Sequence, residues 1–251
     1  MSAPVLSTRG LDKSFGSLVV AKNIELALPK GVRYALIGPN GAGKTTLINM
    51  ITGMVRPNAG QIFLGEDDIT RLEPEARVKR GLVRTYQINT LFPDLNALES
   101  VALTICERRG VAATWWRGLA GYREEADEAF EILSSLSLGC VCYRRTRELA
   151  YGQQRLLEIA LALATRPKVL LLDEPAAGVP KDESAELFRA IAGLSQDITV
   201  LFIEHDMNLV FRFASRIIVM VGGRILVAGT PEEIAADPRV REVYLGQTHH
   251  G

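Results

Sequence analysis

The sequence predicts an α/β protein with a mostly parallel sheet, and three observations support this fold class. Apolar strand-like runs alternate with helix-like segments along most of the chain, which is typical of a parallel sheet covered by helices. A glycine-rich loop at residues 38–46 connects a strand to a helix. A polar, helix-rich stretch at about 74–165 predicts a helical subdomain inserted into a core of about 5–73 and 166–251.

The individual elements follow from the spacing of apolar residues and from glycine and proline. Residues 4–37 contain short strand-like runs (6–11, 18–21 and 24–28), and 60–65 form a further strand. The clearest amphipathic helix is 123–136, with Ala129, Phe130 and Leu133 on its apolar face. We then expect helices at 153–165, 181–194 and 207–214, strands at 168–172, 199–203 and around 216–228, and a terminal helix from 231. We expect residues 1–251 to form a single domain.

Composition narrows the possible functions. Lys and Arg number 29, equal to the 29 Asp and Glu residues, so no basic excess supports general nucleic-acid binding. The N-terminus has no long apolar region, and no apolar run approaches a membrane span, so we expect a chain that is soluble by itself. The 3 cysteines fit a reducing cytoplasm. Cys140 and Cys142 have no paired second set of metal ligands, so we interpret them as packing residues.

The loop at 38–46, GPNGAGKTT, fits the phosphate-binding pattern G-x-x-x-x-G-K-[ST] in its required strand–helix context. Its glycines let successive N–H groups surround an anion, and the following helix directs its positive dipole end to the same place. We predict that Lys44 reaches the terminal phosphates and that the Thr45 hydroxyl binds Mg²⁺. The predicted nucleotide-binding residues of the loop are Gly38, Pro39, Asn40, Gly41, Ala42, Gly43, Lys44, Thr45 and Thr46.

Two adjacent carboxylates follow the apolar run 169–172. A parallel strand delivers its last side chains to the sheet edge where ligands bind. We predict that Asp173 holds Mg²⁺ and that Glu174 orients or deprotonates the water that attacks the γ-phosphate. Two acids that merely end a strand are the plainer alternative, and the nearby phosphate-binding loop disfavours it.

A third motif, LAYGQQR at 149–155, opens a helix a short distance before the acidic strand. Gly152 is expected to expose its N–H at the helix N-terminus, where anions bind. In isolation, ordinary helix capping would explain the motif equally well.

The order of these motifs, followed by a lone histidine, His205, resembles the ATP-binding subunits of ABC transporters over about residues 5–245. The resemblance implies a P-loop NTPase fold with an N-terminal antiparallel β part and an inserted helical subdomain. It implies that Phe15 stacks on adenine and that His205 occupies the switch position. It also implies that Gln87 senses Mg²⁺ and the γ-phosphate and contacts the membrane partner. Finally, it places Tyr151, Gly152 and Gln153 in a signature motif that contacts nucleotide.

Further segments are similar to the ATPases of branched-chain amino acid importers of the LivG type. They are RTYQ at 84–87, LFPDL at 91–95, DEPAAG at 173–178, IEHDM at 203–207, DPRV at 237–240 and YLG at 244–246. This resemblance implies an ATPase that uses ATP and Mg²⁺ and powers solute uptake at the cytoplasmic face of the inner (plasma) membrane. The implied partners are two integral-membrane permease subunits, an extracytoplasmic solute-binding protein and a second ATPase subunit, in a heterodimer or alternatively a homodimer. Importers of urea or other small solutes share much of the pattern, so the solute stays open.

Several positions depart from the family pattern. Ala150 replaces the usual signature serine, Tyr151 replaces a glycine, and Leu161 stands where arginine is common. The loop 176–180 lacks the polar residue expected near its end. We hypothesise that one of the two composite ATP sites is therefore less active. Trp115 and Trp116 in the insertion are either core or a partner surface, and the sequence leaves both readings open.

Three rival functions are weaker. A cytosolic ABC ATPase acting on ribosomes or DNA would usually fuse two nucleotide domains or carry long coiled coils, and this chain has neither. A GTPase or small-molecule kinase would have no use for the signature helix or His205, and the guanine-binding motif N-K-x-D does not occur. A regulatory subunit that hydrolyses little ATP is disfavoured by Glu174, whereas Ala150 and Val179-Pro180 leave room for it.

Overall fold

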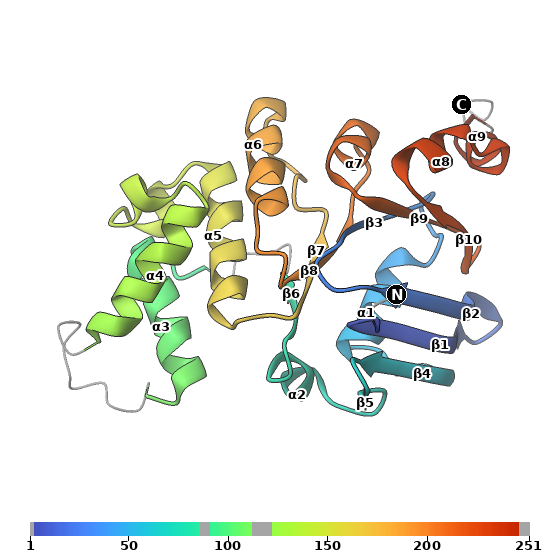
Figure 1. Ribbon diagram of the computed structural model, residues 1–251, viewed down its shortest axis with the longest axis horizontal. Coiled ribbons are helices and arrows are strands. Elements are labelled where there is room, and N and C mark those ends of the chain that lie inside the picture. The colour runs from blue at the N-terminus through green and yellow to red at the C-terminus, as the bar shows by residue number, and fades with distance from the viewer. Residues whose placement is uncertain (1–2, 86–90, 112–121, 246–251) are drawn as a thin grey trace. The chain divides into compact units, whose positions relative to one another are not determined.

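A computed structural model describes residues 3–85, 91–111 and 122–245 (Figure 1). Contacts divide the chain into two units. The first comprises Met1–Arg84, Lys168–Glu174 and Ser195–Gly251, and the second comprises Thr85–Pro167 and Pro175–Leu194. The second unit thus starts later than the helical subdomain expected at 74–165, and it includes a further helix after the acidic strand.

An antiparallel sheet of four strands forms the N-terminal part of the first unit (Figure 1). Its order is β2-β1-β4-β5, with bounds Leu18–Leu28, Leu6–Phe15, Ala59–Leu64 and Asp67–Asp68. The expected runs at 18–21 and 24–28 form one strand. Between them Asn23 adopts a left-handed φ of 49° at an irregularity in the pairing with β1, and the strand continues through this irregularity.

The second sheet of this unit has six strands and is mostly parallel, as predicted. Its order is β10-β9-β3-β8-β7-β6, with bounds Arg224–Gly229, Arg216–Val221, Arg33–Ile37, Thr199–Ile203, Val169–Asp173 and Leu82–Thr85. Strands β9, β3, β8 and β7 pair in parallel, and β10 returns antiparallel to β9. Strand β6, which the sequence did not predict, joins the sheet because the carbonyl of Gly81 accepts hydrogen bonds from the N–H groups of Lys168 and Val169 (2.8 and 3.0 Å).

The hydrophobic core of the first unit lies around helix α1 (Lys44–Thr52). Leu47, Ile48, Met50 and Ile51 of α1 pack in one cluster with buried residues of both sheets. The other helices of this unit are α2 (Pro74–Val78), α7 (Met207–Phe213), α8 (Pro231–Ala236) and α9 (Pro238–Leu245). The expected single terminal helix is two helices, because Pro238 has no N–H to continue α8 and starts α9 instead.

The second unit is helical. Its elements are α3 (Ala97–Arg109), α4 (Arg123–Ser135), the short 3₁₀ turns η2 (Gly139–Val141) and η3 (Thr146–Glu148), α5 (Tyr151–Ala164) and α6 (Lys181–Ala192). Helix α4 buries Ala129 and Leu133 as predicted, whereas Phe130 is 46% exposed. Glu125 is buried on α4 instead, where it pairs with Arg109 of α3 (2.8 Å). Among the described residues, no helix has both the length and the apolar character needed to cross a bilayer.

Candidate functional site

The loop between β3 and α1 can form only with glycine at two positions. Gly38 and Gly43 adopt φ values of 151° and 99°. A Cβ on Gly38 would lie 2.0 Å from the carbonyl oxygen of Met220, and one on Gly43 would lie 2.2 Å from that of Val20. The close approach of two neighbouring strands therefore fixes the loop against the start of α1, where backbone N–H groups can surround a phosphate.

The Lys44 side chain lies within this loop. Its Nζ donates hydrogen bonds to the carbonyl oxygens of Gly38 (2.7 Å) and Pro39 (3.0 Å), and the residue is only 7% exposed. Burial lowers the pKa of Lys44, and the negative charges of Glu174 and Asp173 oppose that shift. The amine therefore lies near both predicted carboxylates.

Glu174 and His205 contact one another. Glu174 follows β7 in a left-handed conformation (φ 48°), and its N–H donates to the carbonyl of Ile203 on β8 (3.0 Å). Its Oε1 lies 3.0 Å from His205 Nε2, while the His205 N–H donates to Glu204 Oε2 (3.1 Å). A left-handed non-glycine residue costs about 1–2 kcal/mol, and such strain is concentrated at functional sites. The backbone thus directs two predicted catalytic side chains toward each other.

Asp173 ends β7 and contacts a residue to which sequence reasoning gave no role. Arg84 Nη2 donates to Asp173 Oδ2 (2.5 Å), and Arg84 Nη1 donates to Asn49 Oδ1 on α1 (2.6 Å). The sequence contained only one signal for this, a basic residue in the RTYQ segment, and strand β6, which positions it, was not predicted.

Two aromatic residues lie at the ends of elements of the first unit. Phe15 ends β1 and is 52% exposed, with Lys13 Nζ 5.0 Å from its ring centroid. An exposed ring face of this kind suits stacking on a base.

Tyr244 on α9 connects the C-terminal helix to the phosphate-binding loop. Burial raises the pKa of Tyr244, and a hydrogen bond with the backbone of Gly38 opposes that shift.

The signature residues lie at the N-terminus of α5 in the second unit. Ala150 caps the helix without a side-chain hydrogen bond, and its own N–H donates to Gln153 Oε1 (3.1 Å). The N–H of Gly152 donates to the carboxylate of Glu183 on α6 (3.2 Å). The Tyr151 hydroxyl donates to the Ala177 carbonyl (3.3 Å), so Tyr151 contacts the 176–180 loop. The helix start predicted for Gly152 is present, and its amide holds an anion from this same chain.

The remaining predicted residues fall into two groups. Pro39, Asn40, Gly41, Ala42 and Thr46 lie in the loop and at the start of α1 with Thr45, whose side chain is exposed. Gln87, Trp115 and Trp116 lie outside the described residues. Cys106 and Cys142 are buried and Cys140 is exposed. Within the described ranges, no group of three or more His, Cys, Asp or Glu side chains is arranged to hold a metal ion.

These residues fit a nucleotide and its magnesium ion. The loop excludes side chains at Gly38 and Gly43, which leaves its amides for phosphate oxygens. Oxygen donors of the kind Mg²⁺ prefers are present as the Thr45 hydroxyl and the Asp173 carboxylate, and Mg²⁺ usually takes further ligands from phosphate and water.

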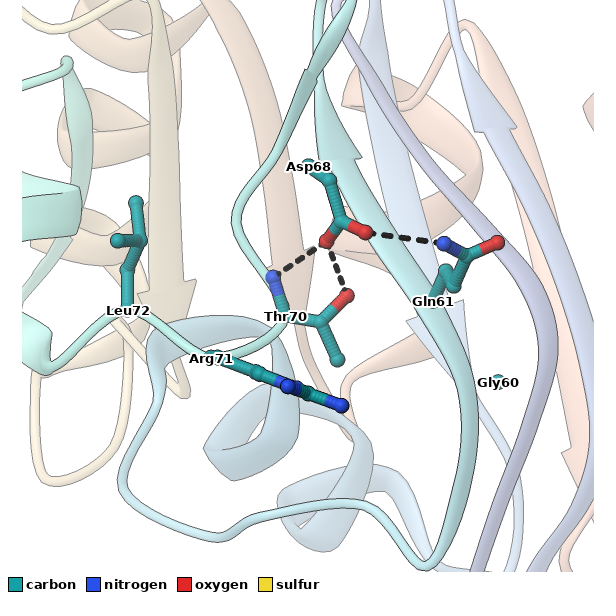
Figure 2. Close-up of a pocket in the computed structure, with 6 residues that line it drawn as sticks. All are labelled: Gly60, Gln61, Asp68, Thr70, Arg71 and Leu72. Carbon is teal, nitrogen blue, oxygen red and sulfur yellow. Dashed lines mark hydrogen bonds between the residues drawn. The ribbon is translucent and has the colours of Figure 1, made fainter.

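A separate surface cavity of about 430 Å³ lies on the antiparallel sheet (Figure 2). Its lining consists of Gly60, Gln61, Asp68, Thr70, Arg71 and Leu72. Asp68 accepts hydrogen bonds from Thr70 and Gln61, and the Thr70 hydroxyl in particular lowers the pKa of Asp68 (Figure 2). The cavity shares no residue with the predicted site, and Asp68 in its lining is hydrogen-bonded to Thr70 and Gln61.

The two sheets, the phosphate-binding loop and the paired Glu174 and His205 define an ATP-binding cassette. The profile of the family described as ABC transporter matches residues 21–177, and that of the branched-chain amino acid ATP-binding cassette transporter matches 224–250. The chain is 39% identical over 256 residues to the high-affinity branched-chain amino acid transport ATP-binding protein BraF of Pseudomonas aeruginosa, which covers 98% of this chain and 100% of the relative. The identity and both coverages are the same for the high-affinity branched-chain amino acid transport ATP-binding protein LivG of Escherichia coli. The crystal structure of the ATP-binding cassette MJ1267 in its ADP conformation matches with a TM-score of 0.85 and 32% identity, covering 98% of this chain and 100% of that one.

The chain belongs to the LivG/BraF family of ABC transporter ATP-binding proteins. It is the ATPase subunit of a membrane transporter, and its ATP hydrolysis drives transport. The fold class, the family and the enzyme class predicted from the sequence are thereby confirmed.

Proposed function

We propose that this chain powers the uptake of branched-chain amino acids from the cytoplasmic face of the plasma membrane. The observation that carries the proposal is the likeness to two branched-chain amino acid transport proteins along the full length of the chain. The separate match at 224–250, to a family described by the same solute class, supports it independently of the ATPase motifs.

We assign the ATP site to one side of the parallel sheet in the first unit. The amides of 38–46 and Lys44 bind the phosphates, and Phe15 stacks on adenine. Thr45, Asp173 and Gln87 hold Mg²⁺, which when bound neutralises charge on the phosphates. Glu174 accepts a proton from the attacking water, and His205, 3.0 Å from its carboxylate, orients that carboxylate.

The signature residues act in the partner ATPase's site rather than in their own. The N-terminus of α5, with Tyr151, Gly152 and Gln153, covers the γ-phosphate held by a second ATPase subunit. ATP then joins two subunits, and hydrolysis releases them, because ATP binds the joined state more tightly. A heterodimer with a related chain is the arrangement we propose, and a homodimer is the alternative.

The remaining parts connect the ATPase to the membrane. We propose two integral-membrane permease subunits, contacted through the Gln87–Leu95 segment, and an extracytoplasmic solute-binding protein. No nucleic acid takes part, because the charge of the chain is balanced. The catalytic core is about 5–73 with 166–251, and about 74–165 forms the helical subdomain of a single functional domain.

Glu174→Gln tests the assigned catalytic role. The amide keeps the size and a hydrogen bond to His205 but cannot accept the proton, so ATP hydrolysis should fall by about 10²–10⁴-fold while ATP binding persists. Steady-state ATPase assays and equilibrium binding of ATP measure the two quantities. Glu186→Gln, the same change on an exposed face of α6, is the matched control and should leave both unchanged. An unchanged hydrolysis rate in Glu174→Gln would refute the role.

Co-purification from native membranes tests the transport function. The tagged chain should bring down two multi-spanning permeases, a second ATPase and a solute-binding protein. That binding protein should bind leucine, isoleucine or valine in calorimetry. Selective binding of urea or another solute would overturn the solute assignment, whereas recovery only with ribosomes or DNA would contradict the transporter assembly itself.

A further inference from the structure

Arg84 connects the proposed metal ligand to the phosphate-binding helix. It lies on β6, next to β7 in the sheet. Its guanidinium donates through Nη2 to Asp173 Oδ2 (2.5 Å) and through Nη1 to Asn49 Oδ1 (2.6 Å). Because Asn49 is on α1, a single side chain joins the end of β7 to the helix that begins at Lys44.

This ion pair is largely removed from solvent. The side chains of Arg84 and Asp173 are 10% and 14% exposed. Charges in such surroundings interact much more strongly than charges in bulk water. The guanidinium of arginine carries a delocalised positive charge. One oxygen of the Asp173 carboxylate is therefore already bonded to a positive charge, which lowers the attraction that a free cation would experience there.

The charges around the loop balance each other. Lys44 and Arg84 are positive, Asp173 and Glu174 are negative, and Arg84 forms an ion pair with Asp173. Without Arg84 the group would carry a net negative charge. Such a site would attract free divalent cations and repel ATP, whereas a magnesium ion that arrives on phosphate oxygens brings its own anionic ligands.

We propose that Arg84 is a positioning residue that makes this site select magnesium carried by the nucleotide over the free ion. It holds Asp173 by one oxygen, offsets the charge of that carboxylate, and fixes it relative to α1 through Asn49. The proposal rests on the role of Asp173 as a Mg²⁺ ligand given above. It predicts opposite effects on two equilibria, binding of the bare cation and binding of metal-free ATP.

The test compares Arg84→Met and Arg84→Gln, which remove the charge, with Arg84→Lys, which keeps it. Mn²⁺ binding to the purified full-length chain without nucleotide is measured by electron paramagnetic resonance. Binding of a fluorescent ATP analogue is measured in EDTA. In both neutral variants we expect Mn²⁺ to bind about tenfold more tightly and metal-free ATP about tenfold more weakly, each change being ~1.4 kcal/mol. Arg84→Lys should stay within about twofold of the parent chain in both assays.

Two controls separate charge from stability. Arg56→Met removes an arginine from an exposed pair with Glu73 and should change neither equilibrium. Asn49→Ala removes another hydrogen-bond partner of Arg84 without changing the charge, so Mn²⁺ affinity should stay near the parent value. Should Arg84→Met fail to fold, Arg84→Gln still hydrogen-bonds and gives the same readout.

Shifts of opposite sign in the neutral variants support the proposal. No shift, or a parallel loss of both affinities, would overturn it and leave Arg84 as a structural tie between β6, β7 and α1. Asp173→Asn separates this failure from failure of the proposed function. If Asp173→Asn leaves Mn²⁺ binding in the ATP complex unchanged, the metal-ligand assignment itself is wrong.

Discussion

The conformation of the phosphate-binding loop requires a residue without a Cβ atom at position 43, which is Gly43. Its φ of 99° disfavours any side chain, and an added Cβ would lie 2.2 Å from the carbonyl oxygen of Val20. Gly43→Ala must therefore displace β2 or the start of α1, and we expect a loss of about 2–4 kcal/mol in the free energy of unfolding together with loss of ATP binding. Urea unfolding and an ATP-binding assay measure the two effects.

Gly65→Ala is the matched control for this steric argument. Gly65 also has a positive φ, 61°, but a Cβ there would meet nothing within 4 Å. Only the left-handed conformation is penalised, at about 1–2 kcal/mol, and ATP binding should persist. Equal losses of stability in both variants would show that backbone conformation, and not the contact with Val20, makes glycine necessary at residue 43.

At the scale of secondary structure, a cluster of charges joins three helices of the second unit. Glu128 on α4 pairs with Arg108 on α3 (2.8 Å) and with Arg166, which follows α5 (3.0 Å). Hydrogen bonds from Arg108, and then from Arg166, lower the pKa of Glu128 from 4.5 to about 2, although burial opposes them. A carboxylate whose pKa is lowered by folding stabilises the fold above its unfolded pKa, and that contribution decreases as the pH falls from 4.5 toward 2.

Glu128→Gln should therefore reduce the free energy of unfolding by about 1–2 kcal/mol near neutral pH, after allowance for solvent screening. The difference between variant and parent should shrink as the pH falls from 4.5 toward 2, because the carboxyl of the unfolded parent binds a proton in this range while that of the folded parent stays ionised. Urea unfolding at a series of pH values measures it. Glu73→Gln, from an exposed pair with Arg56, should differ from the parent by less than about 0.5 kcal/mol. A difference for Glu128→Gln that stays constant down to pH 2 would contradict the linkage.

Elements with local signals could be predicted, and those fixed by distant contacts could not. Helix α6 starts at Lys181 as expected, and β8 has the predicted bounds Thr199–Ile203, because apolar spacing and flanking residues define both. Strand β6 has only four residues, and its place depends on hydrogen bonds from Lys168 and Val169 to Gly81. The pairing of Arg84 with Asp173 spans 89 residues, so no local pattern contains it. Phe130 was misplaced because helical spacing does not show how wide the buried face is.

The same limit applies to the site. Glycine and acidic motifs predicted the loop, Asp173 and Glu174 as site residues, because each motif consists of consecutive residues with a defined chemistry. Glu174 and His205, which contact each other, are 31 residues apart in the sequence. The role expected for His205 came from the family resemblance. The contact between Gly152 and Glu183 was not foreseen, since nothing near residue 152 indicates which carboxylate reaches it.

At the scale of the whole molecule, the signature helix lacks the serine that is usual in the family and begins after Ala150. The side chain of Ala150 makes no capping hydrogen bond to α5. The carboxylate of Glu183 instead accepts a hydrogen bond from the N–H of Gly152. We have proposed that this helix end must receive the γ-phosphate of a second subunit. A carboxylate already bonded to that amide would compete with a phosphate, which agrees with the hypothesis that one composite site is less active.

Ala150→Ser separates the structural part of this hypothesis from the functional part. A serine at the helix cap should raise the free energy of unfolding of the isolated chain by about 0.5–2 kcal/mol, whatever its partner. If the missing hydroxyl also limits the composite site, the ATPase rate of the assembled transporter should rise as well. Urea unfolding of the chain and ATPase assays of the reconstituted transporter measure the two effects. A gain in stability with no rise in ATPase rate would show that Ala150 affects the fold alone, and that both ATP sites work without the serine.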